Sequence, residues 1–363
     1  MKLILYKFLL LGILIPTLSF GNTNLNNRHT REKKITKEFN VDNFGYLDID
    51  NSYGNVDIST WDENRIVIQV LIKVSGNNLD NVLDKLDNIE INFNQDGNRV
   101  TAHTNFEKQN KGWWNSLFSS SSNANREVNY IIKMPVKHNL VIDNDYGAIY
   151  IDRIEGSTDI SCDYGKIDIG ELRGKKNILN FDYTRNSHFG YIENAEIDAD
   201  YSEFSIEEAK TLSIKADYSN SEVLKVVNLN FSCDYGSFYV EKVKNLEANG
   251  DYLTTKIGRV FTTLNLSQDY GSIRIDKLIK GTTRVKIDSD YAGIRLGYDS
   301  EMDFKFNIKT SYGNISGTED LTSLKNHQEN TSKEISGYYG KKESSNLINI
   351  STSYGNVSFR KTP

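Results

Sequence analysis

Proline, cysteine, histidine and surplus positive charge are all scarce in this chain of 363 residues. It has 3 prolines, 2 cysteines and 5 histidines, and its formal net charge is -6. Two cysteines exclude a disulfide-rich scaffold. A net negative charge without a basic stretch disfavours nucleic acid as a partner.

Catalytic and cofactor motifs are missing as well. The histidines are scattered, with no His-x-x-x-His or Cys-x-x-Cys pair, and the chain has neither a glycine-rich phosphate loop nor a Gly-x-Ser-x-Gly elbow. The sequence therefore indicates neither a zinc hydrolase nor a nucleotide enzyme, and it predicts no catalytic and no cofactor-binding residue.

Long apolar runs are absent apart from one at the start of the chain. Lys2 and Lys7 accompany the run "FLLLGILIPTL", which is shorter than a bilayer-spanning helix and is followed by small residues. This pattern is typical of a cleaved secretory signal over residues 1–21, and a retained N-terminal anchor is the alternative. We expect an exported protein of the periplasm or cell surface, without a transmembrane span after signal cleavage. The polar residues 22–35 are expected to form a disordered leader.

Tyrosine is abundant, with 21 residues, and much of it recurs in an Asp-Tyr repeat at intervals of 17 to 21 residues. An apolar residue stands four positions before nearly every repeat tyrosine, and others stand three and five positions after it. Each repeat is thus a strand, a turn and a second strand with period 2. In "DYTRNSHFGYI" one extra residue, a β-bulge, would keep Phe189 and Ile192 inside and His188 outside. The repeat tyrosines are Tyr146, Tyr164, Tyr183, Tyr201, Tyr218, Tyr235, Tyr252, Tyr270, Tyr291 and Tyr312, and Ser311 replaces the aspartate before the last of them.

Short repeats of this kind bury their apolar face only by stacking on one another. The sequence therefore predicts an all-β fold, a parallel β-solenoid (β-helix) of 17–21-residue coils over residues 141–317. Residues 36–140 are expected to form a β-rich N-terminal cap with a loop at 106–127. One short helix is expected there in "NNLDNVLDKL", where Leu79, Val82, Leu83 and Leu86 recur at helical spacing. Residues 318–346 are expected to be a loop insertion, and residues 347–363 a C-terminal strand-turn-strand cap.

The Asp-Tyr dipeptide is interpreted as a structural feature of the turn between the two strands of each repeat. We expect the tyrosine rings to turn toward the core side and stack along one edge, and each aspartate to accept from the N–H two residues on. The glycine that follows at Gly147, Gly165, Gly236 and Gly271 could take a positive φ. The outward aspartates would form one stripe, for which calcium bridging is the alternative to turn capping. These aspartates are Asp145, Asp163, Asp182, Asp200, Asp217, Asp234, Asp251, Asp269 and Asp290.

Two further features concern single residues. Cys162 and Cys233 hold the same slot in repeats four intervals apart, about 19 Å at the usual strand spacing, so both are predicted to be free thiols. Trp113 and Trp114 lie in a serine-rich loop and are candidates for partner binding or membrane contact. Packing of the tryptophans back against the N-terminal cap is the alternative.

The segments "YGNVDISTWDENRIVIQV", "VNYIIKMPVKHNLVIDNDYG" and "SYGNVSF", with the serial Tyr-Gly turns, make the chain specific enough to compare with a family. It resembles the "putative adhesin" family of exported bacterial β-solenoid proteins. That family was long catalogued as a domain of unknown function and is related to autotransporter adhesin head domains. The resemblance covers most of the mature chain. It implies an envelope β-solenoid and supplies no catalytic residue.

The leading hypothesis is a non-enzymatic, exported β-solenoid of the cell envelope with a structural or adhesin-like binding role, and an envelope protein or a glycan as its partner. One alternative is a polysaccharide lyase or glycosidase with clustered carboxylates on a β-helix. The carboxylates recur with the repeat, whereas a single groove with a deviant pair of carboxylates would favour the enzyme. The other alternative is a periplasmic sensor or scaffold for another envelope protein.

Overall fold

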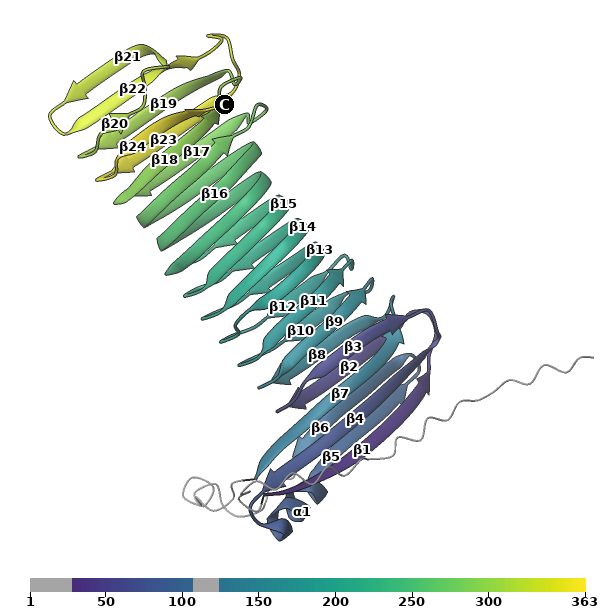
Figure 1. Cartoon of the computed structure of the whole chain (residues 1–363). Coiled ribbons are helices and arrows are strands. Elements are labelled where there is room, and N and C mark those ends of the chain that lie inside the picture. The colour runs from purple at the N-terminus through teal and green to yellow at the C-terminus, as the bar shows by residue number, and fades with distance from the viewer. Residues whose placement is uncertain (1–27, 107–123) are drawn as a thin grey trace, which may run out of the picture.

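The structure, a computed structural model, describes residues 28–106 and 124–363. Within these ranges the protein is almost entirely β, with one sheet of 24 strands and a single helix, so the all-β prediction is confirmed. The stacked strands form one long body (Figure 1). The expected signal peptide lies outside the described residues.

The N-terminal part combines antiparallel pairs of strands with the parallel pairs β2–β6 and β3–β7. β4 lies between β1 and β7, and β5 pairs with β6 across a turn at Gly97, whose φ is 56°. Because β1 begins at His29, the expectation of a disordered leader up to residue 35 is wrong for its last residues. The elements are β1 (His29–Asn40), β2 (Tyr46–Ser52), β3 (Val56–Trp61), β4 (Arg65–Gly76), α1 (Leu79–Asp87), β5 (Ile89–Asp96), β6 (Arg99–Phe106) and β7 (Asn125–Pro135).

The short helix follows from the local sequence. The Asn78 side chain caps the first turn by accepting from the Asn81 N–H. Val82 and Leu86 are buried, whereas Leu83 is 41% exposed, so the apolar face is narrower than the spacing predicts.

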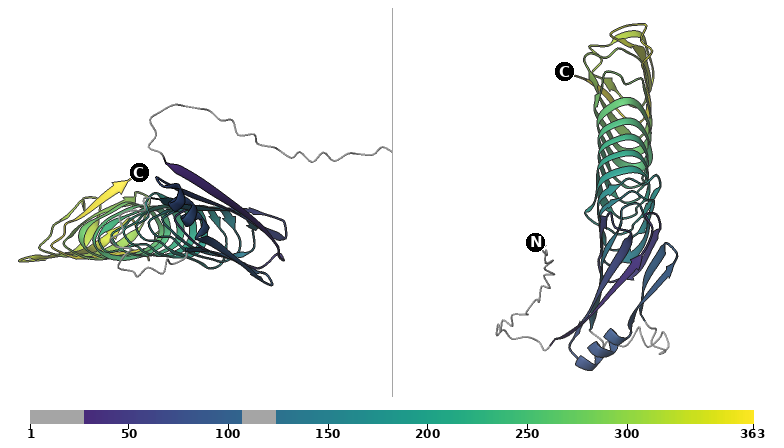
Figure 2. Two further views of the ribbon diagram at one scale, coloured as in Figure 1. Left: turned by 90° about the horizontal axis from the view of Figure 1, so that it is seen from below. Right: turned by 90° about the vertical axis from the view of Figure 1, so that its right-hand side faces the viewer.

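The repeats form two rows of parallel strands, one before and one after each tyrosine. Ile160 lies between Ile142 and Leu179 in register, and all three side chains are buried. Burying an apolar side chain of this size contributes about 1.5–3 kcal/mol, which explains why the alternating pattern dictates the register. Figure 2 shows these repeats stacked along one axis. The strands are β8 (Asn139–Asp145), β9 (Ala148–Ile154), β10 (Thr158–Ser161), β11 (Lys166–Leu172), β12 (Asn177–Asn180), β13 (Ser187–Asp198), β14 (Glu203–Lys215), β15 (Asn220–Ser232), β16 (Gly236–Leu278), β17 (Arg284–Asp290), β18 (Ala292–Asp299), β19 (Phe304–Ser311) and β20 (Ile315–Ser316).

The C-terminal end differs from the sequence expectation in two ways. Residues 318–346, expected as a loop, contain the hairpin β21 (Thr322–Glu329) and β22 (Ser332–Tyr339), and β22 pairs antiparallel with β19. Residues 347–363 form β23 (Leu347–Ser353) and β24 (Val357–Thr362), but they do not lie at the end. β23 pairs in parallel with β17 on one side and β19 on the other. The last segment of the chain is therefore inserted between two earlier repeats.

The outermost strand, β21, is exposed along its whole length. Its pairing with β22 shifts between Ser323 and Lys325, which is the mark of a bulge. Bulges and charged side chains disfavour pairing of an edge with another sheet, so the exposed edge at β21 is a poor partner for a further strand.

Candidate functional site

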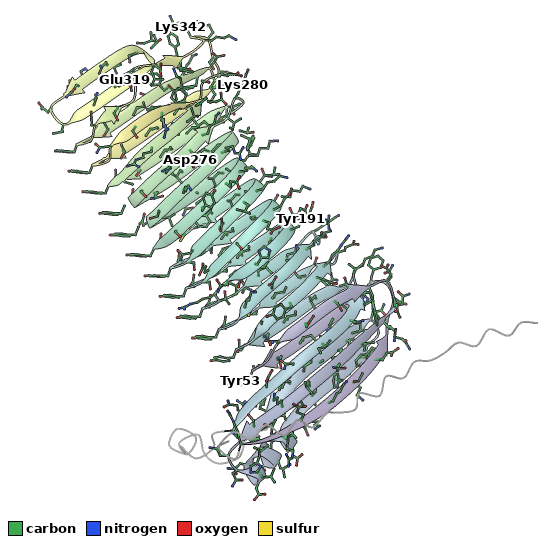
Figure 3. The ribbon with its side chains drawn as sticks, in the orientation of Figure 1. Tyr53, Tyr191, Asp276, Lys280, Glu319 and Lys342 are labelled. Atoms are coloured by element: carbon green, nitrogen blue, oxygen red, sulfur yellow. The ribbon has the colours of Figure 1, made fainter. Side chains whose placement is uncertain are left out.

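Twelve tyrosines form a continuous tyrosine ladder along one corner of the stack. Neighbouring ring centroids are 4.7 to 5.2 Å apart with interplanar angles of 1° to 7°. Figure 3 marks Tyr53 at the N-terminal end, where the Arg126 guanidinium lies 4.3 Å from its ring centroid. The stacking expected from the sequence is confirmed. The rings follow in the order Tyr53, Tyr146, Tyr164, Tyr183, Tyr201, Tyr218, Tyr235, Tyr252, Tyr270, Tyr291, Tyr354 and Tyr312.

The expected orientation of these rings is wrong. Their exposed fractions run from 38% for Tyr53 to 60% for Tyr312, so the rings project from the corner rather than toward the core. The reason is the backbone, because every ladder tyrosine has φ between 53° and 63°. A left-handed residue turns its side chain away from the strand alternation on which the expectation depended.

The glycines have a different role from the one predicted. Among the four glycines, only Gly271 has a positive φ, at 108°. A Cβ at Gly165 would lie 2.0 Å from the carbonyl oxygen of Gly147, so that glycine is needed for the close approach of two repeats. The left-handed conformation costs an L-residue about 1–2 kcal/mol. Stacking on both neighbours, at about 0.5–1.5 kcal/mol per pair, offsets that cost.

The aspartates also bond differently from the expected turn. Oδ1 of an aspartate accepts the backbone N–H of the corresponding residue in the next repeat, at 2.8 to 3.2 Å. The carboxylates therefore connect repeats instead of capping their own turns, because the left-handed tyrosine carries the local N–H groups away. This bond is formed by Asp163, Asp182, Asp200, Asp217, Asp234, Asp269 and Asp290 as acceptors.

Like charges crowd this aspartate stripe, the nine residues from Asp145 to Asp290 named above. Burial, and then the neighbouring carboxylates, raise the pKa of Asp145. Burial likewise raises the pKa of Asp200, with Asp182 and Asp217 adding to the effect and the N–H of Asp217 opposing it. In the part of the chain that the structure describes, no lysine or arginine pairs with the stripe, and no group of three or more His, Cys, Asp or Glu is arranged to hold a metal ion.

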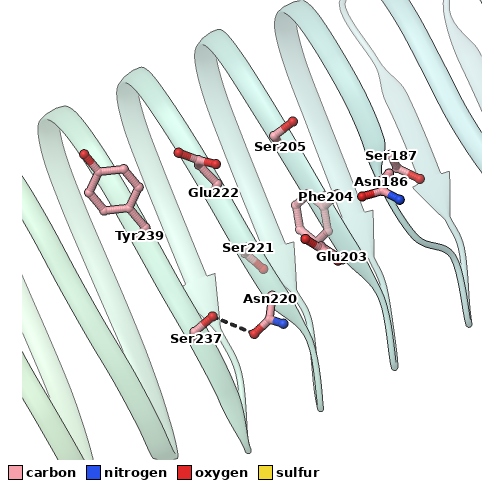
Figure 4. A pocket seen from close by; sticks show the side chains of 10 residues that line it. All are labelled: Asn186, Ser187, Glu203, Phe204, Ser205, Asn220, Ser221, Glu222, Ser237 and Tyr239. Atoms are coloured by element: carbon pink, nitrogen blue, oxygen red, sulfur yellow. Dashed lines mark hydrogen bonds between the residues drawn. The ribbon is translucent and has the colours of Figure 1, made fainter.

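A groove of about 410 Å³ interrupts the sheet face that follows the tyrosines, across β13, β14, β15 and β16 (Figure 4). Sequence reasoning did not find this groove. The available signal was the short side chain of Ser205, which lies in register between His188 and Glu222. The residues that line the groove are Asn186, Ser187, Glu203, Phe204, Ser205, Asn220, Ser221, Glu222, Ser237 and Tyr239.

The extra residue expected in this repeat lies at one end of the groove, in the turn before β13 and not within a strand, so the predicted β-bulge is not formed. Asn186 has φ of 56°, and beyond it Phe189 and Ile192 are buried, as predicted. His188 faces outward, also as predicted, with Nδ1 3.3 Å from Ser205 Oγ and Nε2 3.6 Å from a Glu207 carboxylate oxygen. The longer turn places Ser187, four residues after Tyr183, in register with Phe204, three residues after Tyr201, and the groove lies next to this irregular turn.

Inside the groove, some polar groups are used by the protein itself, because Ser187 Oγ accepts the Ile167 N–H at 3.1 Å and Ser205 Oγ lies 3.3 Å from His188 Nδ1. Ser237 Oγ donates to Asn220 Oδ1 at 2.6 Å. Within the described residues, the carboxylates of Glu203 and Glu222 have no hydrogen bond or ion pair, and the exposed side-chain amide of Asn186 has no hydrogen bond either. The groove therefore offers acceptors and donors that are free for a ligand.

Two other sequence predictions concern single residues. Cys162 and Cys233 are both free and buried, as predicted. Trp113 and Trp114, the partner-binding candidates, lie outside the described residues. Across residues 28–106 and 124–363, no helix has both the length and the apolar character that a membrane crossing requires.

No protein-family model matches this chain, and no curated protein matches it. Among solved structures, a "putative cell adhesion protein" from Clostridium sporogenes is 12% identical, with a TM-score of 0.20, covering 92% of this chain and 100% of its own. A "putative adhesin" from Parabacteroides distasonis is 10% identical, with a TM-score of 0.32, covering 73% and 93%. A "putative lipid binding protein" from the same species is 9% identical, with a TM-score of 0.24, covering 92% and 97%. Such similarity transfers no function to this chain.

Proposed function

We propose that this chain is an exported, non-catalytic β-solenoid of the cell envelope with an adhesin-like binding role. The observation that carries the proposal is a polar groove on one face of a long stack whose repeats keep their register. From β8 to β15 each repeat pairs in parallel with the next, which gives a stiff support. A site held on paired strands keeps its geometry better than one on loops.

The coil and cap organisation is part of this proposal. The two rows of parallel strands, joined at the tyrosine ladder, fit a solenoid with 17–21-residue coils. The antiparallel β1–β4–β7 group would cap one end and the β21–β22 hairpin the other. Caps are required because an open terminal repeat exposes a pairing edge.

Export to the periplasm or the cell surface, and membership of the "putative adhesin" family, also belong to the proposal. The N-terminal sequence and the Tyr-Gly turns support them. Fractionation of cells that express the full chain with a C-terminal epitope tests export. Mass analysis of the recovered protein should show loss of residues 1–21, and an uncleaved protein in the cytoplasm would contradict export.

Glu203 and Glu222 favour a second candidate, a carbohydrate-active enzyme, because two carboxylates outside the repeat code line one groove. The binding role is preferred because, within the described residues, neither carboxylate is held in place by a hydrogen bond or an ion pair, whereas a catalytic pair needs such support. Incubation of the protein with envelope polysaccharide, followed by chromatography of the products, separates the two. Shortened chains that disappear in Glu203→Gln would establish the enzyme.

The binding role itself is tested by retention of envelope material. The secreted protein, coupled to beads, should retain polysaccharide or protein from a detergent-solubilised envelope fraction. Beads that carry the heat-unfolded protein are the matched control. Equal retention by both would contradict the proposal.

A further inference from the structure

We infer that the groove binds a saccharide chain that carries no acidic groups. This inference rests on the proposed binding role and names its ligand class. The polar side chains that line the groove and face outward are those of Asn186, Glu203, Ser205, Asn220, Glu222, Ser237 and Tyr239.

The position of the groove disfavours a peptide ligand. Extended peptides add to sheets at free edges, where unpaired backbone groups are available. Here β14 pairs with β13 on one side and β15 on the other, and β15 pairs in turn with β16. The backbone groups under the groove are consumed by these ladders, so only side chains can recognise a ligand.

The lining has no cation. Neither lysine nor arginine is among its residues, and Glu203 and Glu222 would repel an anionic ligand. Carboxylates only accept hydrogen bonds, while the amides of Asn186 and Asn220 both donate and accept. A ligand that complements this lining must be rich in hydrogen-bond donors. Hydroxyl groups both donate and accept hydrogen bonds, and protonated amines add further donors.

The lining is also poor in apolar surface, which disfavours a lipid chain. Phe204 and Tyr239 are its only aromatic residues, and Phe204 is 2% exposed. Tyr239 is partly exposed at one end, where Lys256 Nζ lies 4.8 Å from its ring centroid. One accessible aromatic among amides, hydroxyls and carboxylates suits the mixed surface of a sugar, with its polar edges and apolar C–H faces.

Ser205 offers a way to fill the groove without touching the core. It is the short side chain at the centre of the row between His188 and Glu222, and it points outward. Ser213 lies near the other end of the same strand, β14, where its side chain is exposed and outside the groove lining. Ser205→Trp and Ser213→Trp are therefore a matched pair that adds the same bulk inside and outside the groove.

Calorimetric titration of the secreted protein with three named probes tests the inference. The probes are the neutral hexasaccharide of N-acetylglucosamine, the cationic hexasaccharide of glucosamine and the anionic hexasaccharide of galacturonic acid. We expect the first two to bind at least about tenfold more tightly than the third. Ser205→Trp should weaken that binding about tenfold or more, and Ser213→Trp should leave it unchanged. Glu222→Gln should weaken the cationic probe more than the neutral one.

Each contrary result overturns the inference. It fails if the wild type binds neither the neutral nor the cationic probe, if the anionic probe binds best, or if Ser205→Trp binds as well as Ser213→Trp while both keep the wild-type melting temperature. Retention of envelope material on beads by wild type and Ser205→Trp alike would refute the groove and leave the binding role standing. No retention by the wild type would refute the binding role itself.

Discussion

The backbone N–H of Asp217 donates a 3.1 Å hydrogen bond to Oδ1 of Asp200, which stands one repeat earlier in the stack. The same carboxylate lies near the negative charge of Asp182 and Asp217, and burial and these charges raise its pKa. The aspartate stripe thus contributes hydrogen bonds between repeats at the cost of repulsion, which for neighbours at strand spacing is about 1 kcal/mol even in water.

Asp200→Asn should stabilise the protein at pH 7, because asparagine keeps the Oδ1 acceptor and removes the charge. Asp200→Ala should destabilise it by about 1 kcal/mol, because the Asp217 N–H loses its partner. The folded-state pKa of Asp200 is raised, so the stability linked to its protonated form is present below the unfolded value of 3.8 and lost as pH rises through the folded pKa. The advantage of Asp200→Asn should therefore vanish as pH falls below about 3.8. Urea midpoints measured from pH 3 to pH 7 check this, and a destabilised Asp200→Asn at pH 7 would contradict it.

Substitutions of Tyr218 test whether ring stacking stabilises the left-handed backbone conformation of the ladder tyrosines. Its φ is 54°, and its ring stacks on Tyr201 at 4.8 Å and Tyr235 at 5.0 Å. Tyr218→Phe should change the stability by less than about 0.5 kcal/mol. Tyr218→Ala should lose about 2 kcal/mol, since both stacks disappear and the backbone strain stays. Tyr218→Gly should recover about 1 kcal/mol of that loss. If glycine were worse than alanine by urea denaturation, the strain argument would fail.

Calcium should not raise the melting temperature. One oxygen of most stripe aspartates already accepts an N–H, and the described residues include no cluster of metal-ligating side chains. Calcium needs about six to eight oxygen ligands, and binding to the folded state alone would raise the melting temperature by mass action. Chelator-treated protein melted with and without millimolar calcium, with magnesium as the control, decides the point. A rise specific to calcium would establish bridging along the stripe.

Both thiols should be inert in the folded protein. Burial, and then nearby aspartates, raise the pKa of Cys162 to about 12, and burial raises that of Cys233 to about 12. Since only the thiolate reacts, we expect Ellman's reagent to label neither residue at pH 8 in buffer and both in urea. The sign of the linkage also predicts that stability from these groups is complete below the unfolded pKa of 9.0 and declines as pH rises above it. Rapid labelling of the native protein would contradict the buried positions.

The inserted C-terminal segment should act as a separable part. Deletion of residues 347–363 removes the buried side chains Ile348, Ile350 and Phe359 and should lower the urea midpoint. A synthetic peptide of residues 347–363 should then bind the truncated protein, because β17 and β19 each offer it a parallel register. A peptide of the same composition in scrambled order is the control. Failure of the native peptide to bind would show that β19 closes directly onto β17.

Much of the fold could be predicted from local pattern alone. The alternation around Ile142 and Ile160 gave the strand rows and their register, because a slip by one residue would expose the apolar set. The spacing of Val82 and Leu86 indicated the helix, and the common slot of Cys162 and Cys233 indicated free thiols. These features depend on local or periodic patterns, so they can be recognised without knowing which distant segments come into contact.

Three features were decided only by the tertiary structure. The hydrogen bond from Asp217 to Asp200 joins residues of different repeats, and a turn considered alone offers each carboxylate a closer donor. The groove depends on where Ser205 and the extra turn residue Asn186 lie relative to neighbouring repeats. The order of the last repeats depends on which of two similar segments packs on the preceding repeat. Tyr312 and Tyr354 stand in segments with the same apolar code, so either could pack on Tyr291. The structure places Tyr354 there because the β21–β22 hairpin packs antiparallel on the outer side of β19, which leaves only the inner side of β19 for the returning chain.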